Sequence, residues 1–265
     1  MPIHCPIDFP RLTTDEMRDL DYQVMAHAFA AQNELGRLCD ESVYQANLAN
    51  RLNAAGISAR IEFPITLAFR EFSKTLSVDL VVDHRVPYEL KAVAQLTDEH
   101  ENQLLCYLLL TNARRGKLLN FRSDSVDSKF VNAPLETADR HQFTVDTTDW
   151  SGDAAFEELV TELISDWGTS LDQSLYLQAM TECLGGKDRV IQQLPMQSAN
   201  GPMGNQRFYL VDAHTAFRVT TFADGVQANQ VKHLQKLIRP SPVDRLYWVN
   251  IARHQLRFQT IHRKS

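Results

Sequence analysis

Membrane spans, a secretory leader and a cysteine scaffold are all missing from this sequence. None of its apolar runs reaches the roughly 18 residues that a membrane helix needs. The N-terminal residues have neither a basic segment nor an apolar core, so secretion is not expected. The four cysteines, Cys5, Cys39, Cys106 and Cys183, form no Cys-x-x-Cys pair. This spacing argues against a zinc knuckle and a disulfide framework, and it favours a reducing, cytoplasmic location.

An excess of basic residues is also missing from the chain as a whole, whose net charge is −6. The charge is unevenly distributed, because residues 201–265 contain ten lysines and arginines against three aspartates, a local charge of +7 that leaves −13 for the remainder. Such asymmetry permits a basic docking surface on an acidic body. A solvated surface of mixed charge explains the same numbers. The 265 residues suffice for one large domain or two of about 130 each.

The first third of the chain has the pattern of two helices followed by strands. Thr13 and Glu16 form a capping-box signature, and apolar residues then recur at helical spacing up to Gly36. A second helix is predicted from Asp40 to Gly56, where glycine suits a helix end. Residues 57–69, with a proline inside, predict a bent or edge strand.

Residues 78–93 predict a hairpin that carries two carboxylates and an ammonium. Asp79 lies on the first strand, and Glu89 and Lys91 point the same way on the second, because side chains alternate along a strand. A helix over residues 97–110 and a strand over residues 116–121 follow. The order helix, helix, three strands, helix, strand predicts a mixed α/β domain. Residues 122–150 are polar and irregular, which suggests a linker.

The second half of the chain repeats the first in a degenerate form. Leu35-Gly36 recurs as Trp167-Gly168, and four further segments recur in order at a nearly constant offset. We therefore expect a tandem duplication, with domains at 1–125 and 151–265 and a linker at 126–150; a separate α/β domain with similar patterning is the alternative. The aligned pairs are Glu41 with Gln173, Asp79 with Phe208, Glu89 with Arg218, and Lys91 with Thr220. The second copy has lost every acidic candidate, although an arginine can bind phosphate.

The first copy has the residue types that hold a hard divalent cation. Mg²⁺ and Mn²⁺ prefer carboxylate and carbonyl oxygens, which Asp79, Glu89 and the backbone carbonyl of Leu90 can supply. Lys91 would orient the attacking water or neutralise developing charge. The spacing Asp-x9-Glu-x-Lys is a weak pattern alone, and an ordinary surface hairpin with a Glu/Lys pair also fits it.

Several motifs along residues 20–122 resemble those of the GxxExxY family and occur in the order typical of that family. The GxxExxY family is placed in the PD-(D/E)XK nuclease-like superfamily. The motifs are Glu41-Ser42-Val43-Tyr44, Val78 to Val82, Tyr88 to Val93, His100 to Tyr107, and Leu118 to Phe121. The resemblance implies a restriction-endonuclease-like mixed sheet flanked by helices, with Asp79, Glu89 and Lys91 at the active site. It also implies that Glu41 reaches the metal and that Gln103 and Tyr107 form the helix motif of exonuclease-like members.

Structural roles remain open for the residues that the resemblance adds. Glu41 fits equally a first-turn acid that complements a helix dipole. Gln103 and Tyr107, four residues apart, also fit a packed helix face.

The predicted function is a Mg²⁺- or Mn²⁺-dependent nuclease acting on nucleic acid, with DNA as the expected substrate. The second lobe would be inactive and would contribute scaffold or substrate contacts, with Arg218 as a candidate contact. The alternative is a non-catalytic nucleic-acid-binding or regulatory module, in phage defence or DNA repair. Homo-oligomerisation through the second lobe is a further hypothesis.

Overall fold

The computed structural model describes residues 2–222 and 227–263, which form two compact units. The first unit comprises Ile3–Leu67 and Lys74–Thr137, and the second comprises Ala68–Ser73 and Ala138–Ser265. None of the described helices is both long enough and apolar enough to cross a bilayer.

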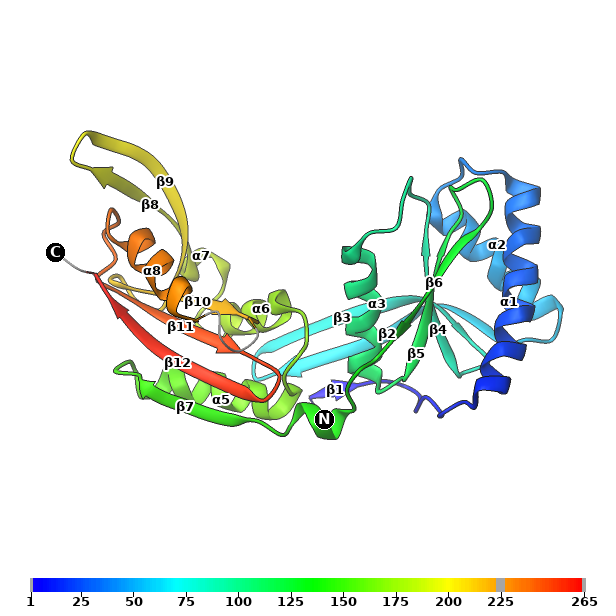
Figure 1. The fold of residues 1–265 in the computed structure, drawn as a ribbon, viewed down its shortest axis with the longest axis horizontal. Coiled ribbons are helices and arrows are strands. Elements are labelled where there is room, and N and C mark those ends of the chain that lie inside the picture. The colour runs from blue at the N-terminus through cyan, green and yellow to red at the C-terminus, as the bar shows by residue number, and fades with distance from the viewer. Residues whose placement is uncertain (1, 223–226, 264–265) are drawn as a thin grey trace. The chain divides into compact units, whose positions relative to one another are not determined.

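The first unit is built on a six-stranded mixed sheet with helices on both faces (Figure 1). Its elements in chain order are β1 (Ile3–His4), α1 (Thr14–Leu35), α2 (Glu41–Ala54), β2 (Ala59–Phe69), β3 (Phe72–Val82), β4 (Val86–Lys91), α3 (Asp98–Thr111), β5 (Arg115–Asn120) and β6 (Asp127–Asn132). The strand order is β1-β2-β3-β4-β5-β6, with β3 antiparallel to β4 and β4 parallel to β5. The parallel pair is connected through α3, as a parallel connection requires a crossover.

The apolar stripes of α1 and α2 pack on one face of this sheet and make the core. Val24 of α1 and Leu48 of α2 are fully buried against Leu80 and Leu90 of the central strands. The predicted capping box is confirmed, because the Thr13 hydroxyl accepts from the Glu16 N–H while Glu16 accepts from the Thr13 N–H. Every residue of β4 is buried, so this strand holds its polar side chains inside the protein.

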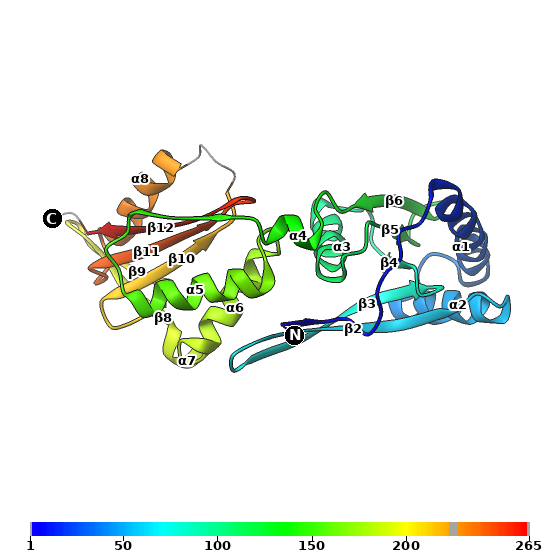
Figure 2. The same cartoon turned by 90° about the horizontal axis from the view of Figure 1, so that it is seen from below.

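The second unit has its own six-stranded sheet and its own core (Figure 2). Its elements follow the short helix α4 (Thr137–Arg140) and are β7 (Thr144–Asp149), α5 (Ala154–Trp167), α6 (Gln173–Cys183), α7 (Lys187–Val190), β8 (Ile191–Ser198), β9 (Gly201–Leu210), β10 (Thr215–Thr220), α8 (Gln227–Ile238), β11 (Arg245–Ile251) and β12 (Gln255–His262). The strand order is β7-β12-β11-β10-β9-β8, with β10 parallel to β11 and antiparallel to β9.

The two units share the order and the pairing of five strands, whereas the sixth strand joins opposite edges, with β1 on β2 and β7 on β12. In each, two long helices precede three strands, and a helix then connects the third strand to a parallel fourth strand that pairs with an antiparallel fifth. The second unit also has the four-residue α7 before its three strands. The register also matches, because Lys91 lies opposite Asn120 in one sheet and Thr220 lies opposite Asn250 in the other. The Asn120 side chain forms two hydrogen bonds with the backbone of Val93, two residues after Lys91. The Asn250 side chain forms the same two bonds with Phe222, two residues after Thr220.

The linker predicted over residues 126–150 is not an irregular segment. It contains β6, which is paired with β5, and β7, which is paired with β12, as well as α4. Both strands lie at the edges of their sheets, and their polar sequences leave most side chains exposed. The two compact units therefore divide near Thr137 rather than across a long connection.

A tyrosine fixes the turn between the two leading helices in each unit. The Tyr44 hydroxyl donates to the Gly36 carbonyl oxygen at 2.7 Å and accepts from the Cys39 N–H. The Tyr176 hydroxyl likewise donates to the Gly168 carbonyl oxygen at 2.6 Å and accepts from the Leu171 N–H. Both glycines have φ near +74°, a conformation that other residues adopt only with strain.

Removal of either hydroxyl is expected to destabilise the protein. Tyr44→Phe and Tyr176→Phe each remove one hydrogen bond to a glycine carbonyl and one from a backbone N–H, which should lower the free energy of unfolding by about 1–2 kcal/mol. Urea unfolding followed by circular dichroism measures this loss. Tyr22→Phe is the control, because the Tyr22 side chain is largely exposed. An equal, negligible effect of all three changes would contradict the assigned role of the hydroxyls.

Candidate active site

Three carboxylates surround one ammonium group at the carboxyl end of β4. Lys91 Nζ lies 2.7 Å from Glu89 Oε1, 3.4 Å from Glu41 Oε1 and 3.7 Å from Asp79 Oδ2. Asp79 comes from β3, Glu89 and Lys91 from β4, and Glu41 from the first turn of α2. The structure thus brings together the four charged residues that the sequence had selected from three separate segments.

Local geometry explains how the two strands place these side chains. Leu80 pairs with Tyr88, so Asp79 is next in register to Glu89, and alternation turns Glu89 and Lys91 to the same face. The Leu90 N–H donates to Asp79 Oδ2 at 2.8 Å, which sets the Leu90 peptide beside that carboxylate.

Burial shifts the proton affinities of the groups in this cluster. The Glu89 side chain is fully buried, and burial together with the Asp79 charge raises the pKa of Glu89 to about 8 despite the nearby ammonium. Burial also raises the pKa of Asp79, against the opposing effects of the Leu90 N–H and Lys91. Burial alone would lower the pKa of Lys91, yet the surrounding carboxylates, Glu89 foremost, raise it. The ammonium is therefore charged at neutral pH.

One oxygen of the buried Glu89 carboxyl has no hydrogen-bond partner. Glu89 Oε2 is one of the few buried side-chain polar atoms in the described part of the chain that lack one. A buried oxygen without a partner is costly, which suggests that it serves a ligand. Among the described residues, however, no group of three or more His, Cys, Asp or Glu side chains is already arranged around a metal position. The Lys91 ammonium is the positive charge that lies among the three carboxylates.

The two α3 residues selected from the sequence, Gln103 and Tyr107, differ in their exposure to solvent. Gln103 is exposed, and its amide donates to the Tyr107 hydroxyl at 3.2 Å. Tyr107 is mostly buried, and burial, with smaller contributions from the charges of Glu89 and Asp79, raises its pKa to about 12. The charges of Glu89 and Asp79 therefore act on the Tyr107 hydroxyl, to which the Gln103 amide is hydrogen-bonded.

Sequence reasoning missed Gln45, which supports the site from α2. Its amide donates to the Asp79 backbone carbonyl at 2.6 Å and to Glu62 Oε1 at 2.9 Å. Gln45 lies one helical turn after Glu41, so its i+4 spacing was the available signal.

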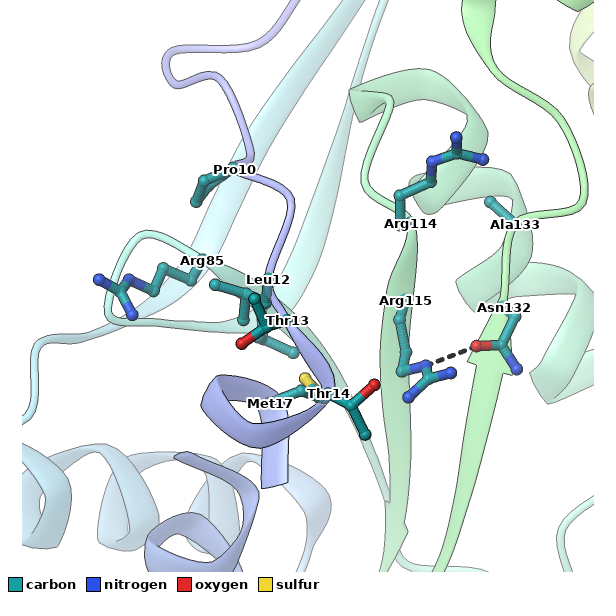
Figure 3. A pocket seen from close by; sticks show the side chains of 11 residues that line it. Pro10, Leu12, Thr13, Thr14, Met17, Arg85, Arg114, Arg115, Asn132 and Ala133 are labelled. Atoms are coloured by element: carbon teal, nitrogen blue, oxygen red, sulfur yellow. Dashed lines mark hydrogen bonds between the residues drawn. The ribbon is translucent and has the colours of Figure 1, made fainter. Parts of the chain in front are cut away.

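The first unit also has a pocket at the opposite end of β4 and β5 (Figure 3). Its lining includes Arg85, Arg114 and Arg115, but their guanidinium groups point in different directions. Each already has a partner, Asp83, Glu136 and Asn132 respectively. This pocket is therefore not a preformed site for one anion.

Comparison with known proteins gives one family match, and it lies within the first unit. Residues 18–131, which contain every first-unit candidate named above, match the family model described as PD-(D/E)XK nuclease superfamily. The two mixed sheets flanked by helices are consistent with a restriction-endonuclease-like fold. A search of the curated proteins found no match. A solved structure titled "Crystal structure of SSO0001" is 18% identical over 45% of this chain and 68% of that chain, with a TM-score of 0.29, a likeness too weak to carry an argument.

Proposed function

We propose that the first unit, with its PD-(D/E)XK nuclease superfamily match, is a Mg²⁺- or Mn²⁺-dependent nuclease that hydrolyses phosphodiester bonds in DNA. Members of that superfamily are usually nucleases. The observation that carries the proposal is the convergence of Glu41, Asp79 and Glu89 on one cation, the Lys91 ammonium. The motif pattern further suggests the GxxExxY subfamily.

The donors present fit a hard divalent cation. Asp79, Glu89, Glu41 and the Leu90 carbonyl would hold it, and the unpaired Glu89 Oε2 is an oxygen available for this role. A bound Mg²⁺ would polarise a phosphate oxygen and lower the pKa of its water. For binding, the Lys91 ammonium must leave its contact with Glu89, which frees it to face substrate.

The other residues of the cluster position the substrate and the attacking water. Lys91, charged and only slightly exposed, neutralises negative charge that develops on the phosphate oxygens. Gln103, exposed at the edge of α3, can donate its amide to the water or to a phosphate. Tyr107 remains protonated at neutral pH and holds the Gln103 amide.

Cleavage of labelled DNA tests the proposal. The purified protein is incubated with single- and double-stranded DNA, and with RNA, in Mg²⁺, Mn²⁺ or EDTA. We expect cleavage of DNA with either metal and none in EDTA. The absence of cleavage under all conditions, or cleavage that survives EDTA, would refute a metal-dependent nuclease.

The second unit is proposed to be a degenerate copy that does not cleave. The shared order of elements and the paired tyrosine contacts support a duplication. Phe208, Arg218 and Thr220 stand where the first unit has its two acids and lysine, so no carboxylate cluster forms there. Its role would be scaffold or substrate contact, with Arg218 as a contact.

A non-catalytic nucleic-acid-binding or regulatory module is the second candidate. It is favoured by the Lys91 ammonium, which already lies within 4 Å of all three carboxylates and can give them a structural role. Calorimetric titration with Mn²⁺ separates the two functions. Binding that is lost in Asp79→Asn supports the nuclease, whereas no binding by the wild-type protein supports the module.

A further inference from the structure

The second unit has a cavity of about 310 Å³ at the position that corresponds to the carboxylate cluster of the first unit. Its lining comes from the start of α6 and from β9, β10, α8 and β11. The lining includes Gln173, Gln206, Arg207, Phe208, Tyr209 and Arg218.

The strand register shows that this cavity corresponds in position to the candidate active site of the first unit. Phe217 pairs with Tyr209, so Phe208 is next in register to Arg218, as Asp79 is to Glu89. Gln173 is the first residue of α6, as Glu41 is the first residue of α2. The cavity is therefore lined by the counterparts of all three carboxylates.

The charge of the cavity is the reverse of that of the carboxylate cluster. None of its lining residues is acidic, and two are arginines. Arg207 is held over the Tyr209 ring at 5.2 Å and donates to the Tyr209 hydroxyl at 2.8 Å. The Arg218 side chain is exposed, and within residues 2–222 and 227–263 it makes no ion pair or hydrogen bond. A guanidinium group with open donors is thus present at the position of Glu89.

We propose that this cavity binds a phosphodiester group of a nucleic-acid strand without a metal ion. The choice of ligand rests on the proposed function of the first unit. A guanidinium group can make two parallel hydrogen bonds to one phosphate and remains charged at all physiological pH values. In the first unit, positive charge would be supplied by a cation on carboxylates; here Arg218 supplies it directly. Gln173 and Gln206 add amide donors at the same cavity.

Binding of single-stranded DNA in EDTA tests the cavity separately from cleavage. The 265-residue protein is titrated into a fluorescein-labelled oligonucleotide of about 20 nucleotides, and anisotropy is followed at several salt concentrations. Arg218→Glu should weaken binding at least about tenfold and reduce the slope of log K against log salt by about 0.7 for each lost phosphate contact. Arg218→Lys keeps the charge and should retain part of the affinity.

Arg253→Glu is the matched control, because it makes the same charge change on an exposed residue of the second unit outside the cavity. It should change the affinity less than about twofold, since distant charges are screened by salt. Circular dichroism checks that each variant is folded.

Three outcomes would overturn the proposal. These are no binding by the wild-type protein in EDTA, equal weakening by Arg218→Glu and Arg253→Glu, and competition by free mononucleotide as effective as that by unlabelled oligonucleotide. Because the assay contains no metal, a protein that never cleaves can still bind through Arg218, and a protein that cleaves can still lack this site. The two proposals therefore fail independently.

Discussion

Lys91→Ala is expected to abolish DNA cleavage while tightening the binding of Mn²⁺. The ammonium lies among the carboxylates, 2.7 Å from Glu89 and 3.7 Å from Asp79, so it competes with any cation for them. Removal of this competing charge should tighten Mn²⁺ binding by about three- to tenfold, which corresponds to about 0.7–1.4 kcal/mol of binding free energy. The same change removes positive charge from the developing phosphate, so the cleavage rate should fall at least about a hundredfold. Calorimetry measures the first effect and labelled DNA the second.

Asp79→Asn and Asp83→Asn make this test specific. Asp79→Asn removes a donor to the metal, so it should weaken Mn²⁺ binding and cleavage together. Asp83→Asn makes the same charge change four residues away in an exposed turn, where φ is +53° and asparagine fits. It should leave both properties close to those of the wild type. If Lys91→Ala binds Mn²⁺ more weakly than the wild type, the lysine is not a competitor of the cation.

The helices and the charged hairpin could be predicted from the sequence because their signals are local. The Thr13–Glu16 capping box and Gly36 determine both ends of α1, and the structure has the helix over Thr14–Leu35. The alternation around Asp79, Glu89 and Lys91 predicts two strands and the face these side chains share, and both strands are present. Each of these inferences needs only the periodicity of a helix or a strand.

The edge strands β6 and β7 could not be predicted in this way. Val131 is the only buried residue of β6, and β7 has none. A strand at the edge of a sheet is held mainly by backbone pairing, which leaves no apolar alternation in the sequence. The i+4 spacing from Glu41 puts Gln45 on the same face of α2. Its bond to the Asp79 carbonyl and the position of the Lys91 ammonium, however, depend on how α2 packs against β3 and β4.

Binding of Mn²⁺ is expected to strengthen as the pH rises to about 8 and then to level off. Glu89 has a pKa of about 8, so its carboxyl is mostly protonated at neutral pH and must lose that proton before it can bind a cation. Below about pH 8, the apparent affinity should therefore rise by up to about tenfold per pH unit, with release of about one proton. Calorimetry between about pH 6 and pH 9, in buffers of different ionisation enthalpy, measures the affinity and the proton count.

The stability of the metal-free protein should depend on pH in the opposite direction. The pKa of Glu89 is raised from 4.5 in the unfolded chain to about 8, so the folded state holds a proton that the unfolded state has lost between these values. This contribution is complete below about pH 4.5 and is lost as the pH rises through about 8. The glutamine of Glu89→Gln cannot titrate, so this variant should show a weaker dependence of both stability and Mn²⁺ affinity on pH. It should also bind Mn²⁺ less tightly than the wild type. A wild-type Mn²⁺ affinity that is constant between about pH 6 and pH 8 would exclude Glu89 as a buried, protonated ligand.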